Sequence, residues 1–255
     1  DPSSYPTDEV ILESLLPGES WYRDFPTVKG DYFPPGKLKR ELKRIREKSQ
    51  SLVQDYAKVG LNLQMLYASI QKARSLFIDD GGEYTWFFRD MKLAHRSGAL
   101  LFLHAGVDDT MAKILSERGV GAANTEFNEL LRTDLFELYH GRVGNSFRTK
   151  YRIGDWPLSR AGVQALHGMG IYFVVHGHRN VHSGQRLMMR SGLVHIECDV
   201  SLDQNTRGLE GLAGMGAGVT LFRTDATILG VSTDYAKVKR LDLSRYFDLV
   251  TLLDN

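Results

Sequence analysis

Histidines follow two apolar stretches of strand length in this chain. Residues 99–103 (ALLFL) lead into His104 and two small residues, and residues 171–175 (IYFVV) lead into His176, a glycine and His178. Ligands of α/β proteins gather beyond the carboxyl ends of strands, and neutral imidazole is a common ligand for zinc, iron and manganese. One histidine at a strand end is more often a hydrogen-bonded structural residue. Because a histidine beside small residues follows both apolar runs, the pattern favours a metal site.

The segments around these histidines resemble the calcineurin-like metallophosphoesterases. LLFLHAGVDD (100–109) resembles the His-Ala/Gly-Gly motif of that family, and VVHGHRN (174–180) resembles the Gly-His motif that closes the same metal site. The interval between His104 and His178 (178 − 104 = 74) is similar to that of the bacterial serine/threonine protein phosphatase branch. GNSFRTKYR (144–152) resembles the segment that supplies a phosphate-gripping arginine, and HIECDVSLD (195–203) resembles the strand and turn after the second histidine.

The resemblance implies phosphomonoester hydrolysis at a centre of two divalent ions (Mn, Fe or Zn), where a bridging hydroxide attacks phosphorus in line. It implies that His104 and His178 bind one metal. Arg148 is the first choice for the phosphate clamp and Arg152 the second, because a planar guanidinium holds two phosphoryl oxygens; a surface ion pair is the alternative for either. His176 shares a strand face with His178, so it is expected either to support a metal ligand or to contact the substrate, and a purely structural role is the alternative.

The chain also departs from the family. The Asp-x-His, Gly-Asp-x-x-Asp-Arg-Gly and Gly-Asn-His-Asp/Glu motifs, which would supply the first metal's ligands, are absent. Asp108, Asp109 and Asp199 are carboxylates near the expected site, although the first two are better placed to cap a following helix. One interpretation is the C-terminal part of a phosphatase whose N-terminal half is missing from this chain. The other is a chain that has lost the activity, and in both cases residues 1–255 alone are expected to be inactive.

The expected substrate is a phosphorylated protein or a small phosphomonoester. A nucleotide or dinucleotide phosphohydrolase is the alternative enzyme, and a non-catalytic interaction module is the alternative from another class. The formal net charge is +1, from 32 basic and 31 acidic residues. Neither a nucleic acid nor a membrane partner is therefore expected. The single cysteine, Cys198, and the absence of a recognisable leader or long apolar run favour the cytoplasm.

Four segments are expected along the chain. Residues 1–35 hold six of the seven prolines and predict an irregular lead-in with one short helix from Asp8 to about Leu16. Residues 36–80 carry two apolar stripes at steps of three and four, on either side of Gly60, which predict an antiparallel helical hairpin with a basic outer face. Residues 81–235 would form the C-terminal part of the metallophosphoesterase domain, and 236–255 a tail.

The fold class expected from these observations is α/β. Apolar runs without alternation suit strands covered on both faces. Further strands are expected at 186–190, 194–197, 219–223 and 227–232, with helices at 109–118, 125–139 and 159–169. The resemblance implies part of a layered β-sandwich flanked by helices, with the hairpin as an insertion.

Overall fold

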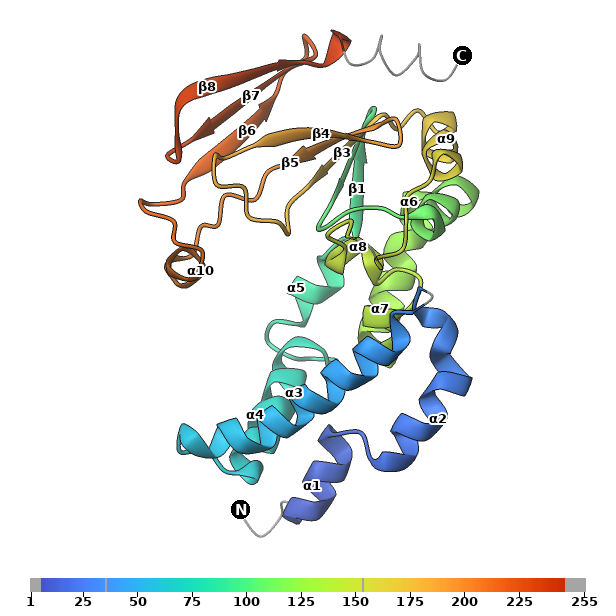
Figure 1. Cartoon of the computed structure of the whole chain (residues 1–255), viewed down its shortest axis with the longest axis vertical. Coiled ribbons are helices and arrows are strands. Elements are labelled where there is room, and N and C mark those ends of the chain that lie inside the picture. The colour runs from blue at the N-terminus through green and yellow to red at the C-terminus, as the bar shows by residue number, and fades with distance from the viewer. Residues whose placement is uncertain (1–5, 35, 153, 246–255) are drawn as a thin grey trace. The chain divides into compact units, whose positions relative to one another are not determined.

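The computed structural model describes residues 6–34, 36–152 and 154–245, which form two compact units (Figure 1). The helical unit comprises the chain up to Met91 together with Asn128–Leu135. The sheet unit comprises Lys92–Phe127 and the chain from Phe136 onward. The structure is mixed α/β, as the sequence predicts.

The helical unit is built from short and long helices with recognisable caps. Thr7 accepts a hydrogen bond from the Val10 amide, and Asn62 accepts one from the Met65 amide at 2.8 Å. The elements are α1 (Asp8–Leu15), α2 (Glu19–Lys29), a 3₁₀ turn η2 (Gly30–Tyr32), α3 (Leu38–Lys58), α4 (Leu63–Phe77) and α5 (Thr85–Asp90).

The lead-in is more helical than the sequence predicts. Helix α2 runs through Pro26, which lacks the amide that an interior helical position normally donates. Aromatic packing compensates for the lost bond: Trp21 stacks on Phe25, one turn later, with ring centroids 4.5 Å apart, and Phe25 meets Phe33 edge to face. The expectation of irregular structure over 19–29 was therefore wrong.

The segment predicted to be a hairpin forms the two helices α3 and α4, but their apolar stripes do not bury each other. Among the described residues, α4 packs mainly against α1 and α5, and no comparable packing joins α4 to α3. Val59 on the first stripe is 72% exposed and Ile70 on the second is 42% exposed. Heptad spacing indicates an apolar helix face, but it does not say which element covers that face.

The sheet unit contains two sheets. The larger has the order β1-β2-β3-β5-β4, with β2, β3 and β5 parallel and both outer strands antiparallel. The smaller is an antiparallel meander of β6, β7 and β8. The strands are β1 (Ala94–Ser97), β2 (Leu100–Leu103), β3 (Phe173–His176), β4 (Arg186–Arg190), β5 (Leu193–Glu197), β6 (Gly218–Phe222), β7 (Thr227–Ser232) and β8 (Tyr235–Asp242).

Residues 236–242 belong to β8, so the prediction of a tail was wrong for this stretch. Residues 246–255 of the predicted tail lie outside the described residues.

Helix α6 (Asp109–Thr133) joins two predicted helices across Gly119, whose φ of 79° breaks the helical geometry. The remaining helices are α7 (Leu135–His140), α8 (Asn145–Arg148), α9 (Arg160–Gly168) and α10 (Gln204–Leu209). None of the helices in the described part of the chain has both the length and the apolar character needed to cross a bilayer.

One apolar cluster of the core lies between the two sheets. Phe173 and Val175 of β3, and Val194 and Ile196 of β5, pack with Ile228 of β7. Because side chains alternate along a strand, the residues between them point to the opposite face of the larger sheet. Those alternate positions include His176, His195 and Glu197, so the strands that build the apolar core also carry a polar face.

The core position Ile196 should matter far more for stability than the stripe position Ile70. Ile196 is 0% exposed, so Ile196→Ala removes fully buried methyl groups and should lower the free energy of unfolding by about 2–5 kcal/mol. Ile70→Ala, at a 42% exposed site, should cost less than half as much. Urea denaturation of the two variants measures both changes. Equal losses of unfolding free energy in the two variants would show that Ile196 does not lie in the apolar core.

Candidate functional site

The parallel pairing of β2 with β3 brings the two predicted metal ligands together. Phe102 is level with Val175, so His104 and His178 follow the same edge of the sheet. The Gly177 amide donates to the His104 carbonyl oxygen at 2.9 Å, which ties the two strand ends directly. His104 Nε2 then lies 3.0 Å from His178 Nδ1, with the rings edge to face.

His178 is held in an unusual conformation and a partly desolvated place. Its φ of 65° is uncommon for a residue with a side chain. Burial lowers the pKa of its imidazole, and His104 and Lys150 lower it further by their charge. A backbone hydrogen bond with Arg148 and the Asp199 carboxylate act in the opposite direction. The neutral imidazole, the form that binds metals, is therefore favoured.

The two predicted clamp arginines have different surroundings. Arg148 Nε donates to the Tyr139 carbonyl at 2.9 Å, and the Arg148 charge lowers the pKa of Asp108, so its guanidinium is engaged on that side. Arg152 is exposed and lines an open pocket together with Arg190.

The carboxylates after His104 serve the fold. Asp108 Oδ1 accepts from the Met111 amide at 2.8 Å and caps α6, while Asp109 Oδ1 accepts from the Ser159 amide at 2.8 Å. Burial raises the pKa of Asp108 to about 6, against the lowering effect of its hydrogen bonds. In the described part of the chain, no three His, Cys, Asp or Glu side chains converge as metal ligands. The histidine pair therefore offers two neutral ligands to one ion, and the described residues do not fit a two-metal centre.

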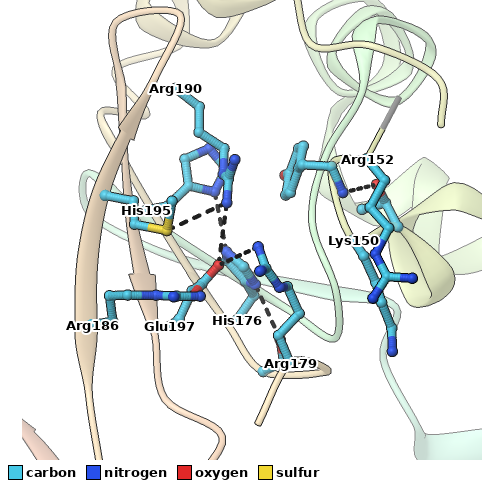
Figure 2. A network of polar contacts seen from close by, with 12 residues as sticks. Lys150, Arg152, His176, Arg179, Arg186, Arg190, His195 and Glu197 are labelled. Carbon is cyan, nitrogen blue, oxygen red and sulfur yellow. Dashed lines mark hydrogen bonds and ion pairs between the residues drawn. The ribbon is translucent and has the colours of Figure 1, made fainter. Parts of the chain in front are cut away.

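A buried ionic network occupies the polar face beside this pair (Figure 2). Glu197 of β5 is fully buried, and three guanidinium groups surround its carboxylate. Arg186 Nε donates to Oε2 at 2.7 Å, Arg190 lies 3.4 Å from Oε1, and Arg179, the residue after His178, lies 3.8 Å from Oε1. A buried carboxylate is costly unless it is paired and hydrogen-bonded. The three guanidinium groups offset that cost. Because they share one carboxylate, the network carries more positive than negative charge.

His176 lies inside the network rather than at the open edge. Its Nδ1 is 3.3 Å from the Gly177 carbonyl, and its Nε2 is 3.1 Å from His195 Nδ1. Because a carbonyl only accepts, Nδ1 of neutral His176 carries the proton and Nε2 accepts from His195. Burial lowers the pKa of His176 to about 4 and the pKa of His195 well below its usual value.

Tyr151 joins this network to the loop after His104. Its hydroxyl accepts from the Val107 amide at 2.8 Å and donates back to the Val107 carbonyl at 3.2 Å. Its ring lies 5.1 Å from the His195 ring and 4.4 Å from the Arg190 guanidinium. Burial raises the pKa of the phenol, so Tyr151 acts as a neutral hydrogen-bonding group.

Sequence reasoning missed His195, Glu197, Arg190 and Tyr151 as members of one cluster. A signal was present in β5, where a histidine and a glutamate alternate with aliphatic residues (LVHIE). Polar residues spaced by two in an apolar strand indicate a polar face that needs partners. The partners come from β4 and from residues 149–155, which only the strand register and the loop path could identify.

Comparison with known proteins adds little to this geometry. No family model and no curated protein sequence matches the chain. Two matching solved structures are a cold-active protein tyrosine phosphatase (15% identity, TM-score 0.42) and a cold-active protein-tyrosine phosphatase of the psychrophile Shewanella sp. (15%, 0.43). The match covers 62% of this chain and 44% and 45% of those chains, so this chain spans less than half their length. This degree of likeness identifies neither a family nor an activity.

The buried histidines should make stability depend on pH. Unfolded histidines take up protons near pH 6.5, whereas folded His176 does so only near pH 4, and burial also lowers the pKa of His195 well below its usual value. Each should therefore reduce the free energy of unfolding as the pH falls below about 6.5, by at most about 1.4 kcal/mol per pH unit. Asp108, with its raised pKa, acts in the opposite sense between about pH 6 and 4.

His195→Asn isolates the histidine contribution, because Asp108 is common to both proteins and cancels in their difference. Urea denaturation at several pH values between 7 and 4 should give a shallower loss of stability for this variant than for the parent. His182→Asn makes the same substitution at an exposed histidine and is the matched control. Identical slopes for His195→Asn and the parent would contradict buried, neutral histidines.

Proposed function

We propose that this chain carries part of the site of a metal-dependent phosphomonoester hydrolase of the calcineurin-like type, with His104 and His178 as ligands of one divalent ion. The observation that carries the proposal is the pair of ring nitrogens 3.0 Å apart at two adjacent parallel strand ends. Two nitrogens bound to one zinc-like ion at about 2.0–2.1 Å each lie roughly 2.8–3.4 Å apart for angles between 90° and tetrahedral. The observed separation suits a shared ion, as it also suits a hydrogen bond between the rings.

The supporting residues would fix this pair for binding. The hydrogen bond between Gly177 and the His104 carbonyl holds the two backbones in register. The hydrogen bond between the His178 imidazole and the Arg148 backbone orients the ring, as outer hydrogen bonds do for metal-binding histidines. When bound, a divalent ion would supply Lewis acidity and a hydroxide that is nucleophilic near neutral pH.

The basic residues nearby would bind the phosphoryl group. Lys150 is close enough to His178 to affect the pKa of its imidazole. Arg148 Nε already donates to the Tyr139 carbonyl, so the Nη groups of its guanidinium would have to hold the phosphate. The substrate class that we propose is a phosphoserine or phosphothreonine side chain. Further metal ligands, including those of a second ion, would have to come from a segment other than the described residues.

Metal binding by the isolated chain tests the proposal. Calorimetric titration with Mn²⁺ or Zn²⁺ should show weak binding, because two neutral ligands provide little affinity and no negative charge. His104→Ala or His178→Ala should weaken that binding at least tenfold, about 1.4 kcal/mol. His182→Ala, which removes an exposed histidine, should leave it unchanged. Binding that survives both site variants would rule out the pair as a metal site.

Activity assays with phosphopeptides and nucleotides in the presence of Mn²⁺ complete this test. We expect no turnover by residues 1–255 alone, because phosphate binding without an activated hydroxide gives no catalysis. Robust metal-dependent turnover would show that other carboxylates complete the centre, and would overturn the ligand set proposed here.

A further inference from the structure

An open pocket of about 530 Å³ lies in the sheet unit, beside the buried ionic network. One wall comes from Tyr151, Arg152 and residues 154–158, which include Trp156, and the other from the end of β4 at Met189 and Arg190. The volume is within the range of small-molecule sites, about 300–1,000 Å³. The wall residues combine aromatic and thioether groups with two guanidinium groups, those of Arg152 and Arg190.

The loop that carries Arg152 is fixed by its own hydrogen bonds. Asp155 Oδ2 accepts from the amides of Lys150 and Arg152 at 3.0 Å each. Tyr151, between those two residues, has a φ of 52° and is anchored through its hydroxyl to Val107. Arg152 is therefore presented on an ordered backbone while its side chain stays exposed. Asp155 also lines the pocket, but its Oδ2 is already occupied by these amides.

Arg190 supplies the second positive group from the opposite wall. Its guanidinium lies 4.4 Å from the centre of the Tyr151 ring and 3.4 Å from Glu197 Oε1. Glu197 is shared with Arg179 and Arg186, so one carboxylate faces three guanidinium groups. Figure 2 shows Lys150 and Arg152 on the loop across from Arg190. The excess positive charge makes this region attractive to an anion.

We propose that this pocket binds a small aromatic molecule that carries a phosphate group. Guanidinium groups bind phosphate oxygens through paired N–H donors, and aromatic and thioether side chains provide area for a planar ring. The required chemistry is an aromatic ring in the same molecule as a phosphate dianion, whether the source is a nucleotide or an aryl phosphate. Binding in this pocket requires neither a bound metal nor catalytic turnover, and Arg152, the residue tested below, is not part of the histidine pair.

Binding of four probes to the intact chain tests the ligand class. Calorimetry with 5′-AMP, phenyl phosphate, adenosine and inorganic phosphate separates the ring from the charge. At least one of the two aromatic phosphates should bind tenfold or more tightly than both adenosine and inorganic phosphate, and which one does so identifies the source. If neither aromatic phosphate binds more tightly than inorganic phosphate, or if adenosine binds as tightly as the preferred aromatic phosphate, the proposal is overturned.

Variants locate the bound probe. Arg152→Ala should weaken binding of the preferred aromatic phosphate about tenfold, and Arg152→Lys should weaken it less because the charge remains. Arg160→Ala removes another exposed arginine of the same unit and should have no effect. Quenching of tryptophan fluorescence by the probe should disappear in Trp156→Phe. Equal affinities for the Arg152→Ala and Arg160→Ala variants, or quenching that persists without Trp156, would place the ligand elsewhere.

Discussion

The parallel pairing of β2, β3 and β5 is the constraint on which the rest of the sheet unit depends. Parallel strands bring their carboxyl ends to one edge, so residues far apart in the sequence meet there without long loops. His104 and His178 are neighbours because Phe102 is level with Val175, and the Gly177 amide closes the gap between the strand ends. A shift of the register by one residue would turn the core side chains of β3 to the other face.

The same strands also have to satisfy a polar face. His176, His195 and Glu197 occupy alternate positions in β3 and β5, behind the apolar side chains that pack on the smaller sheet. Each buried polar group in this set has a cost that partners must offset. The three arginines around Glu197 and the contact between the two histidines supply those partners, and the surplus guanidinium charge extends to the open pocket. The fold and the candidate binding surfaces therefore share one network.

Much of the sheet unit could be predicted from sequence because apolar runs and caps are local signals. The strands at 186–190 and 227–232 have the predicted bounds, and the His104 and His178 side chains meet as the paired strand ends indicate. Tertiary packing decided the rest. Aromatic stacking around Phe25 keeps α2 helical through Pro26, and the α4 stripe packs on α1 and α5. The contacts of Arg190 with Tyr151 and Glu197 join a strand, a loop and a neighbouring strand, and no single segment encodes them.

The central claim, that His104 and His178 together form a divalent metal site, is tested most directly by nitrogen NMR of the imidazole rings during titration with Zn²⁺. The account predicts that Nε2 of His104 and Nδ1 of His178 shift together toward values for metal-bound nitrogen, while the buried pair His176 and His195 keeps its resonances. Unchanged resonances of His104 and His178 at zinc concentrations that shift the exposed His182 would contradict it.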